Sequence, residues 1–189
     1  MDAWCAKDAL RAVLHTVLLS RALGRVTPRE LRLQSFPALG VASCGNAAVE
    51  QSVENALERF FAGGLQLVGP DLVRGELMVS FYESRRRAGL FGSAEERVYW
   101  ERWLVPVIVN QSASSRESGG EAVLRASLMR VVLLASDVGH VPRPPDGNAT
   151  FKYELSVSQQ HNKVSGQPGV AATLLNQMLQ SGPPMRFNL

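Results

Sequence analysis

Histidine and cysteine are the side chains most often used for catalysis and metal binding, and this chain has three histidines and two cysteines. His15 lies in the middle of an apolar helical segment, which favours a buried structural role. His140 follows the expected end of a helix, where it interacts favourably with the helix dipole, and His161 lies in a polar stretch. No two histidines have the i, i+4 spacing of a helical zinc site, and neither Cys5 nor Cys44 is near a histidine. We therefore predict no catalytic, cofactor-binding or metal-binding residues.

Three glutamates, Glu95, Glu96 and Glu101, could supply a carboxylate pair for general acid–base chemistry. They lie in a charged connection, however, and such runs more often form a solvated face. The chain has neither glycine-rich motif that binds nucleotide phosphates, and it has no nucleophile elbow. The sequence favours a protein that is not an enzyme, with a small enzyme of unrecognised type as the alternative.

Six aromatic residues lie within 23 residues, between Phe81 and Trp103. Alternation with polar residues places Phe81 and Trp103 on the core face of two strands. Leu90 and Phe91 differ, because a glycine on each side flanks two bulky apolar side chains at the tip of a long connection. The composition leaves two structures open for this tip: it folds down onto the sheet, or it forms an exposed finger that contacts a partner.

The composition of the chain is that of an ordinary globular protein. Its 189 residues are 46% hydrophobic and 20% charged, which predicts one domain over residues 1–189 without disulfide or metal staples. The net charge of +3 is small, and Arg85–Arg87 is the only basic run, so we do not expect nucleic-acid binding. The longest nearly apolar stretch, Ala12–Leu19, is far shorter than a membrane span, and we expect a soluble intracellular chain.

Apolar periodicity predicts three main helices, over residues 4–24, 46–62 and 118–138. The third has the apolar stripe Leu124, Leu128, Val131, Val132 and Ala135. Alternation with period two predicts strands over 77–82, 103–109 and 151–157.

Segments between these elements are predicted as follows. Residues 25–45 contain loops and one short strand, and residues 83–102 form a long connection with a finger loop at about 85–98. Pro106 indicates a sheet edge or a bulge in its strand. Residues 111–120 form a flexible polar loop, and Val170–Gln180 is a short apolar helix candidate. The pattern predicts an α+β fold, an antiparallel sheet with helices packed on one face.

Several blocks of the sequence occur in the same order in one known family. They are the helix block Ala12–Leu19 with Arg21–Gly24, the strand Leu77–Glu83, the block Glu96–Trp103, the tripeptide His140–Pro142 and the strand Phe151–Val157. On these residues the chain resembles the autophagy-related protein 101 family, closest to its plant and algal forms. The resemblance covers most of residues 9–182, and the family's leading edge strand has no counterpart before the first helix.

The resemblance implies a HORMA domain with three main helices on one face of an antiparallel sheet. It implies a non-catalytic adaptor that binds and stabilises the HORMA domain of autophagy-related protein 13 within the Atg1-type kinase complex, in the cytoplasm at the phagophore assembly site. The family's finger, which helps to recruit downstream factors, corresponds to Leu90 and Phe91, where leucine replaces the expected tryptophan. By analogy with other HORMA pairs, we expect the third helix, with Arg125 and Arg130, to contribute to the partner face. The alternative is a peptide-binding HORMA adaptor in checkpoint or DNA-repair signalling.

Overall fold

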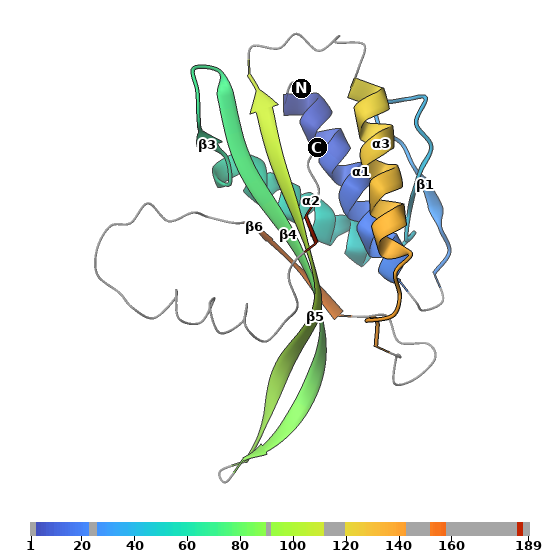
Figure 1. Ribbon diagram of the computed structural model, residues 1–189, viewed down its shortest axis with the longest axis vertical. Coiled ribbons are helices and arrows are strands. Elements are labelled where there is room, and N and C mark those ends of the chain that lie inside the picture. Colours follow the sequence, from blue (N-terminus) through green and yellow to red (C-terminus); the bar gives the residue numbers. More distant parts are fainter. Residues whose placement is uncertain are drawn as a thin grey trace, which may run out of the picture.

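The computed structural model describes residues 3–22, 26–89, 92–111, 120–142, 152–157 and 185–186 (Figure 1). In chain order the elements are α1 (Ala3–Arg21), β1 (Arg29–Leu31), β2 (Val41–Ser43), α2 (Ala47–Gly63), β3 (Gln66–Leu67), β4 (Leu72–Gly89), β5 (Gly92–Asn110), α3 (Gly120–Ala135), β6 (Lys152–Val157) and β7 (Met185–Arg186). The α+β class and the three predicted helices are confirmed. Within the described residues no helix is both long enough and apolar enough to cross a bilayer.

Some predictions fall outside these ranges or need correction. Residues 25–45 were predicted to hold one strand, but β1 and β2 pair with each other antiparallel, with Glu30 opposite Ala42. Most of the predicted loop 111–120, the tip residues Leu90 and Phe91, and the helix candidate Val170–Gln180 lie outside the described residues.

The main sheet is built on the long antiparallel pair of β4 and β5. β3 and β6 both pair with β4, antiparallel, while β7 pairs with the other side of β5 in the parallel direction. Pro106 lies opposite Glu76, and β7 meets β5 only at Trp103 and Leu104. Among the described strands none pairs with the outer edge of β5 at Pro106, so this proline lies at a sheet edge, as predicted.

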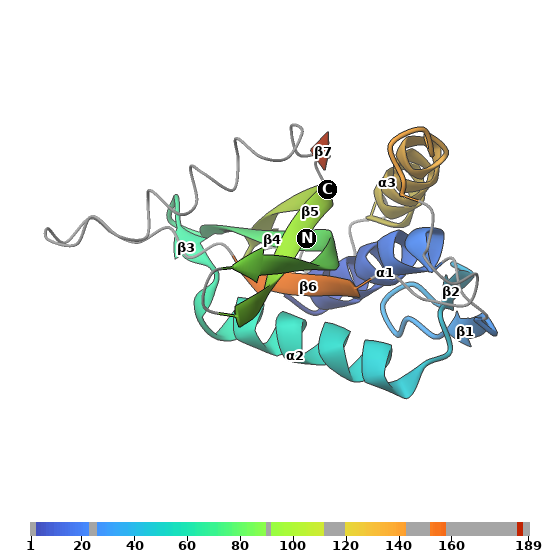
Figure 2. The ribbon, with the colours of Figure 1, turned by 90° about the horizontal axis from the view of Figure 1, so that it is seen from below.

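Alternate residues of β4 and β5 face the helices and form the core, as their alternation predicted. Eight of these apolar side chains are buried: Val73, Leu77, Val79, Phe81, Trp103, Val105, Val107 and Val109. Figure 2 shows α1 and α2 on this face of the sheet, and α3 beside α1. Among the described elements, the helices therefore cover one face of the sheet, as expected for this class.

The predicted finger loop at about 85–98 is wrong as a description of the backbone. Both strands continue past the sheet, with Arg85 opposite Glu96 and Gly89 opposite Gly92. β6 ends its pairing at Tyr82, so beyond that level β4 and β5 form a two-stranded projection, visible in Figure 1. We call residues 83–89 and 92–98 the ribbon. In the sequence its charged residues resemble a loop, because none of the described side chains of the ribbon is buried in the core.

Helix α2 approaches the sheet closely because Gly75 of β4 leaves room for it. Asn46 caps the helix, its side chain accepting hydrogen bonds from the backbone N–H groups of Ala48 and Val49. Near the other end Phe60 lies on β4 at Gly75, where a β-carbon would come within 2.6 Å of the ring and of the Gly64 carbonyl oxygen. The packing of α2 on β4 thus requires glycine at position 75.

Helix α1 is central, as its apolar periodicity predicted, and α3 packs against it through Leu124, Val131 and Ala135. His15 is buried in α1, as expected of a structural histidine. Desolvation lowers the pKa of His15 below its ordinary value, an effect that exceeds the opposing attraction of Glu50 and Glu54. Burial therefore favours the neutral form of this imidazole.

We predict that Gly75→Ala lowers the free energy of unfolding by about 1–3 kcal/mol, the usual range for overpacking a close contact. Gly63, at the end of α2, provides a matched control, because a β-carbon there meets nothing within 4 Å. Urea unfolding of both variants checks this. Equal stability of Gly75→Ala and Gly63→Ala would show that α2 is not held as closely to β4 as described.

Candidate functional site

Among the described residues, those that could do acid–base or metal chemistry do not converge. Across the described part of the chain no group of three or more His, Cys, Asp or Glu side chains could hold a metal ion. Glu95 and Glu96 are exposed on the ribbon, whereas Glu101 is buried against Arg21. The prediction that all three form a solvated face is therefore wrong for Glu101. His140 lies near it, with Nε2 3.7 Å from a carboxylate oxygen of Glu101.

The first candidate surface is the ribbon, which leaves the sheet at a β-bulge. Phe81 lies opposite Glu101 but Tyr82 lies opposite Tyr99, so Trp100 is the extra residue of β5. A bulge bends its strand and increases the local twist. The ring centroid of Trp100 is 5.4 Å from that of Phe81, which anchors the bulge to the core.

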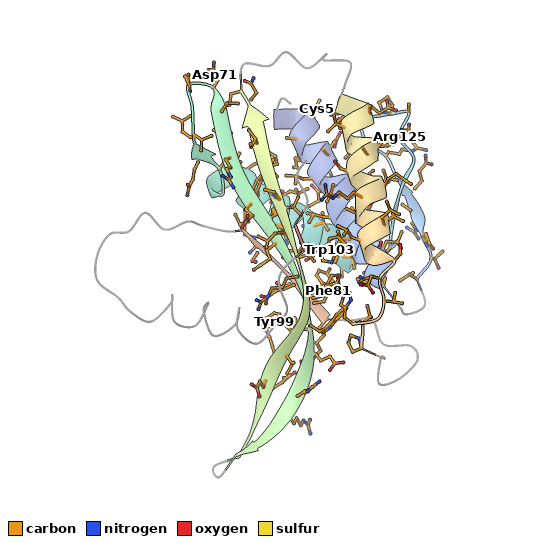
Figure 3. All side chains as sticks on the ribbon, viewed as in Figure 1. Cys5, Asp71, Phe81, Tyr99, Trp103 and Arg125 are labelled. Atoms are coloured by element: carbon orange, nitrogen blue, oxygen red, sulfur yellow. The ribbon has the colours of Figure 1, made fainter. Side chains whose placement is uncertain are left out.

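A cluster of polar and aromatic side chains holds the base of the ribbon to β6. Glu154 of β6 accepts hydrogen bonds from Arg97 Nη1 at 2.9 Å and from the Tyr99 hydroxyl at 3.1 Å. The Arg97 guanidinium lies over the Tyr82 ring, 4.9 Å from its centroid, and Arg102 lies similarly over Tyr99. Figure 3 shows Tyr99 where the ribbon leaves the sheet. These contacts fix the direction of the ribbon relative to β6.

Lys152 of β6 adds a second connection to the ribbon. Its ammonium group donates to the Ser84 hydroxyl at 2.7 Å and to Glu95 at 3.3 Å. Contacts with Ser84 and Lys152 lower the pKa of the Glu95 carboxyl, so this residue stays ionised. One strand of the main sheet therefore contacts both strands of the ribbon.

The second candidate surface is the outer face of α3, opposite the side that packs on α1. Ala122, Ala126, Met129 and Leu133 follow one another at helical spacing along this face, and Met129 and Leu133 are strongly exposed. Val132 is exposed as well, so its predicted place in the buried stripe is wrong. A helix with apolar residues on opposite faces normally has both faces covered.

Arginines border this outer face of α3. Arg125 and Arg130 are both exposed, and the Arg125 guanidinium donates to Glu121, one turn earlier, at 3.0 Å. Figure 3 shows Arg125 on α3, far from the ribbon. The partner face expected by analogy with other HORMA pairs includes Arg125 and Arg130 but not Met129 and Leu133. Their spacing, offset from the buried stripe, is the signal that could have identified them.

The fold and these two surfaces define a class of protein: a mixed α+β domain, consistent with a HORMA-type fold, with an exposed apolar helix face and a projecting β-ribbon. The sequence profile of the family "Autophagy-related protein 101" matches residues 1–147. The chain is similar to Autophagy-related protein 101 of Arabidopsis thaliana, with 24% identity over 208 residues that include 97% of this chain and 93% of the relative. The chain belongs to the autophagy-related protein 101 family, and its role is autophagy-related.

We predict that Glu154→Ala loosens the base of the ribbon without unfolding the domain. Exposed ion pairs contribute about 0–1 kcal/mol, so trypsin cleavage at Arg85 and Arg86 should accelerate up to about fivefold while the melting temperature changes little. Timed proteolysis with mass spectrometry measures the rate.

Glu121→Ala is the control for this measurement, because it removes an exposed carboxylate that pairs with Arg125 on α3. It should leave ribbon cleavage unchanged. Identical cleavage of the Glu154→Ala variant and the wild type would mean that β6 does not hold the ribbon.

Proposed function

We propose that this chain is a non-catalytic adaptor subunit of the autophagy initiation complex. It binds and stabilises the HORMA domain of autophagy-related protein 13 and connects it to the Atg1-type kinase. It acts in the cytoplasm, at the phagophore assembly site, where the ribbon tip helps to recruit downstream factors. Family membership supports the autophagy-related part of this function, and the exposed outer face of α3 supports the adaptor part.

The observation that carries the proposal is the outer face of α3. Leu133 is 69% exposed and Met129 is 58% exposed, and both lie on a helix whose opposite side is already buried. Burying a leucine or methionine side chain contributes about 1.5–3 kcal/mol, so a partner that covers both gains substantial affinity. Arg125 and Arg130 border these side chains, in keeping with an apolar centre and a polar rim.

Stabilisation of the partner follows from the same contact. A ligand that binds only the folded form of a protein lowers its unfolded population, and the effect grows with the ratio of concentration to Kd. An adaptor with a preformed helix face therefore protects a labile partner domain without any catalytic step.

The ribbon provides a second, separate contact. It projects away from α3 in Figure 1, so a factor bound at its tip would not compete with a partner bound at α3. Glu154 and Lys152 keep its base fixed, which reduces the entropy lost on binding. Leucine at position 90 retains apolar area but lacks the indole N–H and most of the ring surface of tryptophan.

Size-exclusion chromatography with light scattering on the chain mixed with the autophagy-related protein 13 HORMA domain of the same organism tests the proposal. We expect a one-to-one complex. Leu133→Glu should weaken it at least tenfold, since hot-spot apolar side chains contribute more than about 1.4 kcal/mol.

Leu67→Glu is the matched control, because Leu67 has the same 69% exposure as Leu133 but lies on β3. This variant and Phe91→Ala should both bind like the wild type. The proposal fails if the two folded proteins do not associate, or if Leu133→Glu and Leu67→Glu weaken the complex equally.

A further inference from the structure

The outer face of α3 carries opposite charges at a regular spacing. Arg130 lies in the second half of the helix, and Asp137 follows its last turn, which the hydrogen bond from the Ser136 N–H to the Val132 carbonyl closes at 3.0 Å. Both charged side chains are exposed. Seven residues are just under two helical turns, so Arg130 and Asp137 lie on the same flank of the exposed face.

The exposed apolar side chains of this region are arranged about the same midpoint as the two charges. The midpoint between Arg130 and Asp137 falls next to Leu133, which is 69% exposed. Met129 and Val138 lie at equal sequence distances on either side of that midpoint, and they are 58% and 62% exposed. The surface is therefore complementary to itself when its direction is reversed.

A two-fold axis through this midpoint pairs α3 with the α3 of a second copy in antiparallel orientation. In such an isologous contact residue i of one copy meets residue j of the other, and j meets i. Arg130 of each copy then lies beside Asp137 of the other. Met129 lies beside Val138, and the two Leu133 side chains meet near the axis. A parallel pair would instead place like charges side by side, so charge complementarity favours the antiparallel arrangement.

Helix α3 is accessible for this contact. Figure 2 shows it at the margin of the helix layer, beside α1, and only its inner side, with Leu124 and Val131, is buried. The contact involves about two helical turns from each copy, which is less than the roughly 1,200–2,000 Å² of a stable interface. We therefore expect a weak dimer whose population depends on concentration.

We propose that this chain self-associates through the outer face of α3, as an antiparallel two-fold dimer with reciprocal ion pairs between Arg130 and Asp137. The dimer covers Met129 and Leu133, so self-association and binding of the proposed partner exclude one another. This mutual exclusion rests on the proposed function, whereas the self-association itself does not.

Sedimentation velocity of the chain alone, over a wide range of concentrations, tests the self-association. We expect the wild type to pass from monomer to dimer as its concentration rises. Arg130→Glu and Asp137→Arg each replace the attractive reciprocal contacts by repulsive ones, so each variant should raise the Kd of the dimer at least about tenfold. Leu133→Glu should weaken the dimer as well, because it brings two carboxylates together near the axis.

A mixture of the two charge variants tests the antiparallel geometry. When an Arg130→Glu chain pairs with an Asp137→Arg chain, both reciprocal contacts again join opposite charges. We expect this mixture to dimerise with the Kd of the wild type, although neither variant does so alone. A contact through other residues would not be restored in this way.

Arg74→Glu is the matched control, since it makes the same change of charge at an exposed residue of β4 and should dimerise like the wild type. Emission of the buried Trp103 monitors folding in every variant. The proposal is overturned if the wild type stays monomeric at every concentration, if the single charge variants dimerise like the wild type, or if their mixture does not associate. Only this chain is used, so these outcomes do not bear on the binding of a different partner.

Discussion

The buried ion pair between Arg21 and Glu101 determines how the helices and the sheet fit together. Both residues are almost inaccessible, at 2% and 4% exposure. Arg21 Nε and Nη2 donate to the two carboxylate oxygens of Glu101 at 2.6 and 3.0 Å, and Nη1 donates to the Ala135 carbonyl at 2.7 Å. Each of the three guanidinium nitrogens thus has an acceptor, and the carboxylate balances the buried charge. Removing one partner of such a pair typically costs about 3–5 kcal/mol.

This interaction joins two helices to the main sheet. Arg21 ends α1, Glu101 belongs to β5, and Ala135 ends α3. A cation at the end of α1 also interacts favourably with the partial negative charge of that helix terminus. Because the same guanidinium holds the last turn of α3, the inner side of this helix is fixed and its apolar outer side stays available. Glu101 also directly follows the bulge at Trp100, so the ribbon starts from a fixed point.

Much of the fold could be predicted from the sequence, because most of it follows from local periodicity. The helices α1, α2 and α3 and the buried faces of β4 and β5 have clear periods of 3.6 or two residues. The ribbon could not be predicted in this way, because none of its described side chains is buried and a strand without a buried face lacks the alternation that identifies it. Glu101 was wrongly predicted to be solvated for a related reason: its partner, Arg21, is 80 residues away in the sequence. No local sequence pattern predicts an ion pair between residues that are so far apart in the sequence.

The candidate site was predictable in outline but not in its residues. Resemblance to a family pointed to the third helix and to Leu90 and Phe91, whereas the exposed apolar residues of α3 emerged only from the packing. Val132 illustrates why packing could not be predicted: its helical spacing fits the buried stripe of α3, yet its side chain is exposed. Fewer apolar side chains of α3 pack on α1 than its sequence indicates. The apolar side chains that remain exposed, Met129 and Leu133 among them, form the proposed partner surface.

Hydrogen exchange measured on the chain alone and saturated with the HORMA domain of autophagy-related protein 13 tests the central claim most directly. The account predicts that backbone amides of α3 become more protected in the complex while those of the ribbon exchange at the same rate. Protection of the ribbon with no change in α3 would contradict it, because the partner would then bind at the projection rather than at the uncovered helix face.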